Sequence, residues 1–161
     1  MTLQARGLAA FDFDNTITES TSEPKYCGDE IVFNMGSASR VLALRTLFVE
    51  LRKSGVILIV VSLNFRETIE NVFAEYGLLE FFFRIYDRTN VWAQHIGTKQ
   101  ILMENRIIFN QLNPVLCVLV DDQPDNLVDA PCNVVEIRGP GGITMKHDYE
   151  IRIFFNIHMM N

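Results

Sequence analysis

The sequence predicts an α/β fold, in which a parallel β-sheet lies between two layers of helices. Segments with the pattern of strands alternate with segments with the pattern of helices, which is typical of such a sheet. Residues 56–61 (VILIVV) are apolar throughout, as expected of a central strand that is buried on both faces. The chain has 161 residues, which suits a single domain over residues 1–161.

Local patterns predict the individual elements. We expect strands at residues 8–13, 56–61, 81–86, 115–120 and 133–137. We expect helices at residues 38–54, 64–76, 98–111, 124–129 and 147–158. The first helix has apolar residues at helical spacing, and Gly55 lies where a C-terminal cap is expected. Asn64 and Glu67 have the spacing of a capping box at the start of the second helix, which Gly77 ends.

Polar and charged residues follow the predicted strands at the ends where parallel sheets bind their ligands. They are Asp12, Asp14 and Thr16 at the end of the first strand, Ser62 and Asn64 after the second, Lys99 at the start of the helix after the third, and Asp121, Asp122 and Asp125 after the fourth. Because the carboxyl ends of parallel strands meet at one edge of a sheet, we expect these side chains to converge.

Such a group of carboxylates needs a counter-charge. Asp12, Asp14, Asp121 and Asp122 would repel one another and raise one another's pKa values. Carboxylate and carbonyl oxygens without histidine or cysteine suit a hard cation, and Mg²⁺ is the usual one beside phosphate. The sequence therefore predicts a Mg²⁺ site that, together with a lysine, attracts an anionic substrate.

In this order, the residues resemble the four motifs of the haloacid dehalogenase superfamily of phosphohydrolases. Residues 12–16 (DFDNT) match the family's DxDxT nucleophile motif, and Ser62, Lys99 and Asp121-Asp122 follow in the family's order. The resemblance covers about residues 8–137. A response-regulator receiver uses similar residues on a similar sheet, but there the acidic pair comes first.

Within the superfamily, the chain looks most like the compact magnesium-dependent phosphatases. Residues 97–99 (GTK) and the Asp-Asp-x-x-x-Asn run at 121–126 carry this likeness. It implies a Rossmann-like, three-layer fold with a five-stranded parallel sheet and no cap domain.

The resemblance also implies catalytic and metal-binding roles. Asp12 would attack phosphorus and become an aspartyl-phosphate, while Asp14 would act as general acid and then general base. Mg²⁺ would be held by Asp12, the Asp14 backbone carbonyl and Asp122. Asp121 and Asp125 would be supporting acids, although either Asp121 or Asp122 could be the direct ligand. The residues that would bind the substrate phosphate or shape its site are Thr16, Ser62, Asn64 and Lys99.

The intervals between the predicted strands leave no room for a cap over the site. In residues 15–55 a helix takes about half of the interval, which leaves enough only for a hairpin-like flap, and residues 87–97 are too few for a domain. An open site favours a phosphoprotein or another bulky substrate without excluding a small phosphomonoester. A flap near Lys25 and Tyr26 would then influence selectivity.

Composition limits the other functions. The formal net charge of −6 argues against general binding to nucleic acid, which weakens the alternative of a nucleic-acid end phosphatase. A second alternative is a catalytically silent interaction module on the same fold. The three cysteines match no zinc pattern, and neither a signal peptide nor an apolar run of membrane-spanning length is found, so we expect an intracellular, cytoplasmic protein. The oligomeric state stays open.

Other conspicuous residues are expected to have structural roles. The histidines His95, His147 and His158 share no ligand spacing. The Phe81-Phe82-Phe83 run is expected in the core, and Phe154-Phe155 is expected to dock the last helix. Trp92 is expected to pack locally near the mouth of the site.

Overall fold

A computed structural model of the chain describes residues 5–21, 33–91 and 98–157. Its main sheet has five parallel strands in the order β5-β4-β1-β6-β7. The strands are β1 (Gly7–Phe11), β4 (Val56–Val61), β5 (Arg84–Tyr86), β6 (Cys117–Asp121) and β7 (Asn133–Glu136). The predicted parallel sheet is therefore confirmed, with β1 at its centre.

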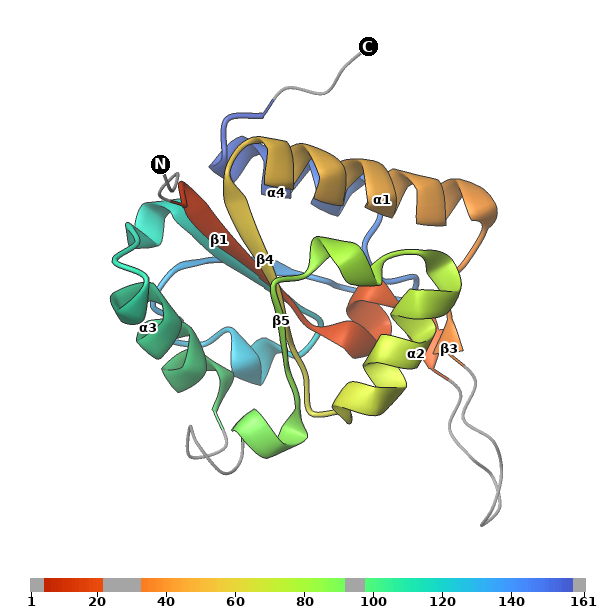
Figure 1. Cartoon of the computed structure of the whole chain (residues 1–161), viewed down its shortest axis with the longest axis horizontal. Helices are drawn as coiled ribbons and strands as arrows, with labels where there is room; N and C mark the ends of the chain where they lie inside the picture. Colours follow the sequence, from red (N-terminus) through yellow and green to blue (C-terminus); the bar gives the residue numbers. More distant parts are fainter. Residues whose placement is uncertain (1–4, 22–32, 92–97, 158–161) are drawn as a thin grey trace.

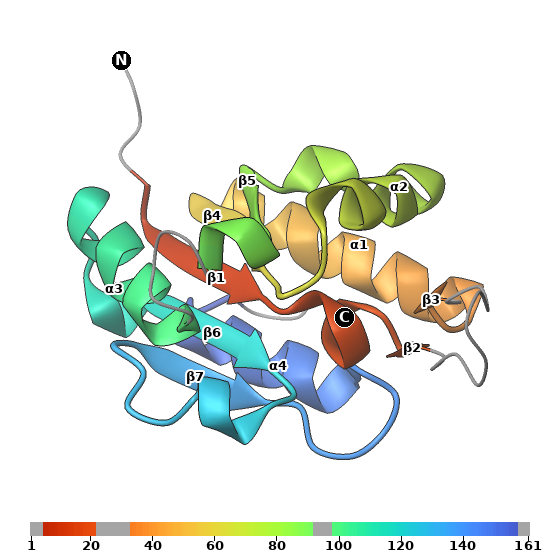
Figure 2. The same ribbon diagram turned by 90° about the horizontal axis from the view of Figure 1, so that it is seen from below.

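Four helices cover this sheet: α1 (Ala38–Lys53), α2 (Arg66–Tyr76), α3 (Lys99–Phe109) and α4 (Met145–Phe154). Figures 1 and 2 show α1 and α3 on opposite sides of the sheet. Side chains alternate accordingly along β1, because Ala9 and Phe11 pack in the core under α1, α2 and α4, whereas Leu8 and Ala10 pack under α3. The strands are thus buried on both faces, as their continuous apolar sequences predict.

A short antiparallel pair, β2 (Ser20–Thr21) and β3 (Phe33–Asn34), follows the first strand. It lies within the interval in which the sequence predicts a hairpin-like flap. Residues 22–32, which include Lys25 and Tyr26, lie outside the described part of the chain, as do Trp92, His95, Gly97 and His158.

The third predicted strand is too long. Residues Leu79–Phe81 form a 3₁₀ turn, and β5 begins only at Arg84. The aromatic run explains the difference: the Phe82 ring contacts the rings of Phe48 and Phe73, with centroids 5.1 and 4.9 Å apart. Phe81 is buried as well, but Phe83 is 70% exposed, so only part of the run belongs to the core.

The predicted capping box at Asn64 is wrong. Helix α2 begins at Arg66, and its N-cap Phe65 makes no side-chain cap. The Asp87 carboxylate instead accepts a hydrogen bond from the Arg66 backbone N–H at 3.2 Å. The Asn64 side chain is directed to the functional site, where its amide contacts Asp14.

The remaining boundaries differ by a few residues. Strand β6 includes Asp121, residues Pro124–Asn126 form only a 3₁₀ turn, and α4 spans Met145–Phe154 rather than 147–158. Thr144 and His147 form a capping box at the start of α4, which gives this buried histidine a structural role. Phe155 is fully buried and docks the end of α4 in the core, as predicted.

Candidate active site

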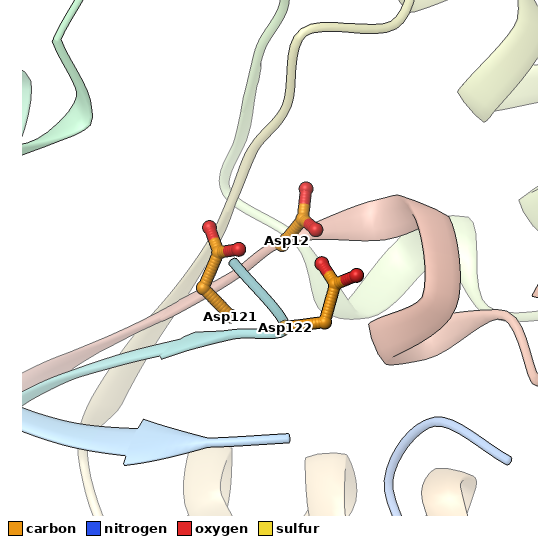
Figure 3. A group of neighbouring side chains, drawn as sticks. All are labelled: Asp12, Asp121 and Asp122. Carbon is orange, nitrogen blue, oxygen red and sulfur yellow. The ribbon is translucent and has the colours of Figure 1, made fainter. Parts of the chain in front are cut away.

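Adjacent central strands bring the first and last motifs together. Phe11 of β1 pairs with Val120 of β6, and the Asp12 backbone N–H donates to the Val120 carbonyl at 2.9 Å. Asp12 and Asp121 therefore emerge side by side at the carboxyl edge of the sheet. Figure 3 shows their carboxylates gathered with that of Asp122.

A short turn, Phe13–Ile17, shapes the chain after Asp12, and its backbone leaves helical geometry at Asp14 and Asn15. Phe13 and Ile17 are buried and anchor this turn in the core. Asn15 has a φ of 58°, a left-handed conformation that asparagine tolerates better than most residues, and its N–H donates to Thr18 Oγ1 at 2.9 Å. The buried Thr16 hydroxyl donates a hydrogen bond to Asp12 Oδ2 at 3.5 Å. The turn thus holds the DxDxT segment in one defined shape.

Lys99 is the cation at the centre of the site. Its Nζ donates to Asp12 Oδ1 at 2.9 Å and to Asp121 Oδ2 at 2.7 Å. Lys99, Asp12 and Asp121 are respectively 3%, 6% and 0% exposed, so both ion pairs are shielded from water. Thr98 positions the lysine, because its side chain caps α3 by accepting from the Ile101 N–H.

Burial and mutual charge shift the pKa values of Asp12, Asp121 and Lys99. It raises the pKa of Asp12 from 3.8 to about 7, although the charge of Lys99 opposes this shift. Burial and then the charge of Asp12 raise the pKa of Asp121, again against Lys99. Burial alone would lower the pKa of Lys99, but the two carboxylates outweigh it and the pKa is raised. Lys99 therefore stays charged, whereas Asp12 is held near the midpoint of its titration at neutral pH.

A third carboxylate completes an acidic group. Ligand oxygens of Asp12, Asp121 and Asp122 all lie within 4.8 Å of one another. When these three carboxylates are ionised, Lys99 offsets one charge and leaves a formal charge of −2. Clustered carboxylate oxygens with this charge fit a hard divalent cation such as Mg²⁺. The donor set is therefore consistent with the predicted metal site.

The oxygens of Asp121 and Asp122 are engaged to different degrees. Asp121 Oδ1 accepts from the Gln123 N–H at 2.9 Å, and its Oδ2 accepts from Lys99 and also from Asn126 Nδ2 at 3.3 Å. Asp122 Oδ2 accepts from Gln123 Nε2 at 3.2 Å. Asp121 is thus held on both oxygens by the protein, whereas Asp122 is half-buried and less constrained.

The second motif contacts the first through Asn64. Its Nδ2 lies 3.4 and 3.3 Å from the two carboxylate oxygens of Asp14, which is half-buried. The Asn64 N–H donates to Ser62 Oγ at 3.0 Å, and the Ser62 N–H donates to the Tyr86 carbonyl at 2.9 Å. Ser62 is fully buried at the end of β4. This chain of contacts links β5, the serine and the proposed general acid.

Asp125 differs from the other predicted residues. It is exposed in the turn after β6, its backbone carbonyl accepts from Gln100 Nε2 at 2.7 Å, and its carboxylate is outside the three-acid group. Two other residues instead position the acids: Gln123, to which the sequence assigned no role, and Asn126, the last residue of the Asp-Asp-x-x-x-Asn run. For Gln123 the only sequence signal was the turn-forming segment after the strand.

Arg40 is a further residue without a sequence signal. From the first turn of α1, it donates to the backbone carbonyls of Thr16 and Ile17 at 3.2 and 2.9 Å, and also to those of Met35 and Ile143 at 2.8 and 3.2 Å. It therefore fixes the end of the DxDxT turn against β3 and the loop before α4.

No family model matches the sequence, and no curated protein matches it. Solved structures do match over most of the chain. An uncharacterised protein from Corynebacterium glutamicum has 17% identity and a TM-score of 0.60, with 97% of this chain and 98% of that chain covered. The 3-deoxy-D-manno-octulosonate 8-phosphate phosphatase of Moraxella catarrhalis, solved with magnesium, phosphate and KDO, has 15% identity and a TM-score of 0.56, with coverages of 95% and 89%.

A haloacid dehalogenase-like hydrolase from Streptococcus pneumoniae has 11% identity and a TM-score of 0.58, with 94% of this chain and 99% of that chain covered. At these identities the likeness establishes the arrangement of the chain, and it extends along almost its whole length. The chain therefore has the haloacid dehalogenase-like fold that its four motifs predict.

Proposed function

We propose that this chain is a Mg²⁺-dependent phosphomonoester hydrolase that forms an aspartyl-phosphate on Asp12. The observation that carries the proposal is the buried Asp12 carboxylate, which contacts Lys99 and belongs to a group of three acids at the carboxyl edge of the sheet. Two of the similar structures are named as phosphatase or phosphatase domain and contain magnesium, which supports the same chemistry here.

In the proposed reaction, an Asp12 oxygen attacks phosphorus and the ester oxygen leaves, taking a proton from Asp14. A water molecule then attacks the phosphorus of the aspartyl-phosphate and gives its proton to Asp14. Inorganic phosphate departs and the Asp12 carboxylate is restored. The contact from Asn64 holds Asp14 in place for both proton transfers.

Lys99, Ser62, Asn64 and Thr16 are proposed to bind the phosphoryl oxygens or to shape their site. Lys99 Nζ contacts Asp12 directly, so a phosphoryl group transferred to Asp12 would remain next to this cation. Mg²⁺ would be held by Asp12, the Asp14 carbonyl and Asp122, and it would supply positive charge that lowers the repulsion between nucleophile and substrate. Asp125, which is exposed, is left with no direct part in the reaction.

Asp122 is proposed as the direct ligand in preference to Asp121. Both oxygens of Asp121 already accept hydrogen bonds, including one from Lys99, and a carboxylate engaged in this way has less capacity for a metal. We expect Asp122→Asn to weaken Mg²⁺ binding measured by calorimetry. Asp121→Asn should chiefly alter the stability of the metal-free protein, because it removes a partner of Lys99. If Asp121→Asn weakened Mg²⁺ binding and Asp122→Asn did not, Asp121 would be the direct ligand instead.

The decisive experiment measures hydrolysis of p-nitrophenyl phosphate by the purified chain with Mg²⁺ or with a chelator. We expect Mg²⁺-dependent turnover that Asp12→Asn abolishes and that the matched substitution Asp125→Asn leaves unchanged. A beryllofluoride adduct on Asp12 would identify the nucleophile. If Mg²⁺ binds but turnover equals that of Asp12→Asn, the phosphatase proposal fails and a catalytically silent module is favoured.

The substrate is proposed to be a phosphoprotein or another bulky phosphomonoester that reaches an uncapped site in a one-domain, intracellular enzyme. The two described cysteines, Cys117 and Cys132, are free thiols, which supports a reducing compartment. No helix among the described residues is long and apolar enough to cross a membrane. A panel of phosphopeptides and sugar phosphates tests the preference, since faster turnover of the sugar phosphates would contradict it.

A further inference from the structure

A cavity lies on the α3 side of the sheet, away from the acidic group. It has a volume of about 190 Å³, and its apolar floor includes Leu8, Ile57 and Ile59. Leu8 and Ile57 belong to the amino-terminal ends of β1 and β4, whereas the proposed catalytic residues follow the carboxyl ends of the same strands. The cavity is therefore a separate feature of the fold.

Aromatic side chains surround this floor. Phe83 and Phe109 both line the cavity and are 70% and 73% exposed, so two large rings at one hollow lie mostly in water. Tyr86, the last residue of β5, adds a third ring and a hydroxyl group. Exposed aromatic residues around an apolar hollow are typical of a binding surface rather than of a solvated face.

Arg106 also lines the cavity, and one nitrogen of its guanidinium has no hydrogen-bond partner among the described residues. Its guanidinium carbon lies 5.0 Å from the Phe109 ring centroid and 5.8 Å from that of Tyr86, and Nη1 lies 3.5 Å from the Tyr86 hydroxyl. Arg106 Nε is the only buried side-chain nitrogen or oxygen without a hydrogen-bond partner in residues 5–21, 33–91 and 98–157. Such a group is uncommon in folded proteins, so the protein itself leaves part of this guanidinium unpaired.

The charges around the cavity all have one sign. Arg84 also lines it, with its guanidinium 5.8 Å from the Phe83 ring, and no aspartate or glutamate belongs to the lining. Among the described residues, neither arginine has a carboxylate within ion-pair distance. In a chain of formal net charge −6, two such arginines at one apolar hollow favour an anion.

We propose that this cavity binds a small aromatic carboxylate. The ring would cover the apolar floor between Phe83 and Phe109, and the carboxylate would pair with the planar guanidinium of Arg106. The volume is below the roughly 300–1,000 Å³ typical of drug-sized pockets, which limits the ligand to a single ring with a short acidic arm. Inorganic phosphate would satisfy the charge but leave the floor uncovered.

The test titrates 3-phenylpropionate into the full, isotope-labelled chain and follows side-chain NMR signals of Tyr86, Phe109 and Asn110, all of which line the cavity. The neutral 3-phenylpropionamide is the matched ligand, because it has the same shape without the charge. At up to about 10 mM, above the roughly millimolar Kd expected for so small a ligand, the acid should give saturable shifts. The amide should bind at least about tenfold more weakly.

Arg106→Met keeps the apolar stem and removes the charge, so it should weaken binding of the acid at least about tenfold without affecting the amide. Arg45→Met is the control, since that exposed arginine pairs with Glu80 elsewhere. Equal binding of acid and amide, insensitivity to Arg106→Met, or no saturable shift would each overturn the proposal. The comparison of acid with amide on the unsubstituted chain stands even if Arg106→Met fails to fold.

Discussion

Replacing the proposed nucleophile should abolish activity and at the same time stabilise the metal-free protein. Asp12 is 6% exposed, and burial raises its pKa from 3.8 to about 7. A shift of about three units corresponds to about 4 kcal/mol of free energy against the ionised form in the folded state. An asparagine side chain at this position would carry no charge, so it would avoid this cost. We therefore expect Asp12→Asn to increase the free energy of unfolding by about 2–4 kcal/mol at about pH 8.

The dependence on pH follows from the direction of the shift. Below a pH of about 4, Asp12 is protonated in both the folded and the unfolded states, so its substitution removes no unfavourable charge. Between about pH 4 and about pH 7 the unfolded chain has lost this proton and the folded chain still holds it, so the wild-type protein loses stability as the pH rises. Above the folded-state pKa of about 7 the loss is complete. The advantage of Asp12→Asn should therefore grow from about pH 5 to about pH 8 and then remain constant.

Urea unfolding and thermal melting in a chelator measure this difference, with an expected rise in Tm of about 5–15 °C at about pH 8. Asp125→Asn is the matched control, because it removes one negative charge from an exposed position near the site and should show no comparable gain. Added Mg²⁺ should stabilise the wild-type protein more than the variant. A lower Tm for Asp12→Asn at about pH 8, or a gain that is the same at about pH 5, would refute the reasoning.

Three further predictions concern other buried groups. Lys99→Met leaves two buried carboxylates without their cation and should lower the free energy of unfolding by about 3–5 kcal/mol in urea titrations with a chelator. An unchanged free energy of unfolding would contradict a stabilising role of these ion pairs. Arg40→Ala leaves four backbone carbonyls without their shared donor and should lower the free energy of unfolding by about 2–4 kcal/mol in the same assay. A decrease smaller than the error of the measurement would show that water replaces the arginine. Burial raises the pKa of Cys117 to about 11 and that of Cys132 to about 12. Iodoacetamide at about pH 8 should therefore label both thiols at least about a hundredfold more slowly in the folded chain than in the urea-unfolded chain, as measured by peptide mass spectrometry. Equal labelling rates in the two states would contradict the burial of these thiols.

The sheet and the edge that holds the site could be predicted from the sequence. The apolar runs that form β4 and β6 are long enough to identify buried strands without knowledge of tertiary contacts. Parallel topology then requires that the polar residues after these strands lie at one edge. For that reason the amino-acid sequence alone assigns Asp12 and Asp122 to the same place.

The individual contacts of the site could not be predicted in the same way. The predicted strand at 115–120 ended before Asp121, but the ladder with β7 extends to the pair Asp121–Glu136 and buries this acid. Lys99 was expected to bind phosphate, and in the structure it contacts two carboxylates. Both outcomes depend on the register of distant segments and on the direction from which α3 approaches, which no local pattern encodes.

Asn64 shows how a tertiary contact can override a local motif. Its spacing to Glu67 fits a capping box, but the Asn64 amide contacts Asp14, fifty positions earlier in the chain. The helix is instead capped by Asp87, which lies just after β5. In the aromatic run, likewise, Phe82 and Phe83 have identical side chains but different exposures, because only the first can reach the rings of α1 and α2.

The register of the sheet also explains why the site needs its lysine before it needs a metal. Because β1 pairs directly with β6, the fold places Asp12 beside Asp121 whether or not a cation is bound. Lys99 approaches from the α3 side and offsets one of their two charges within the protein, so we expect the chain to fold without an ion. With Asp122, which lies outside those two ion pairs, the three ionised acids keep a formal charge of −2 beside Lys99. A divalent cation bound there would complete the neutralisation without displacing Lys99, which is why we expect its removal to stop catalysis but leave the fold intact.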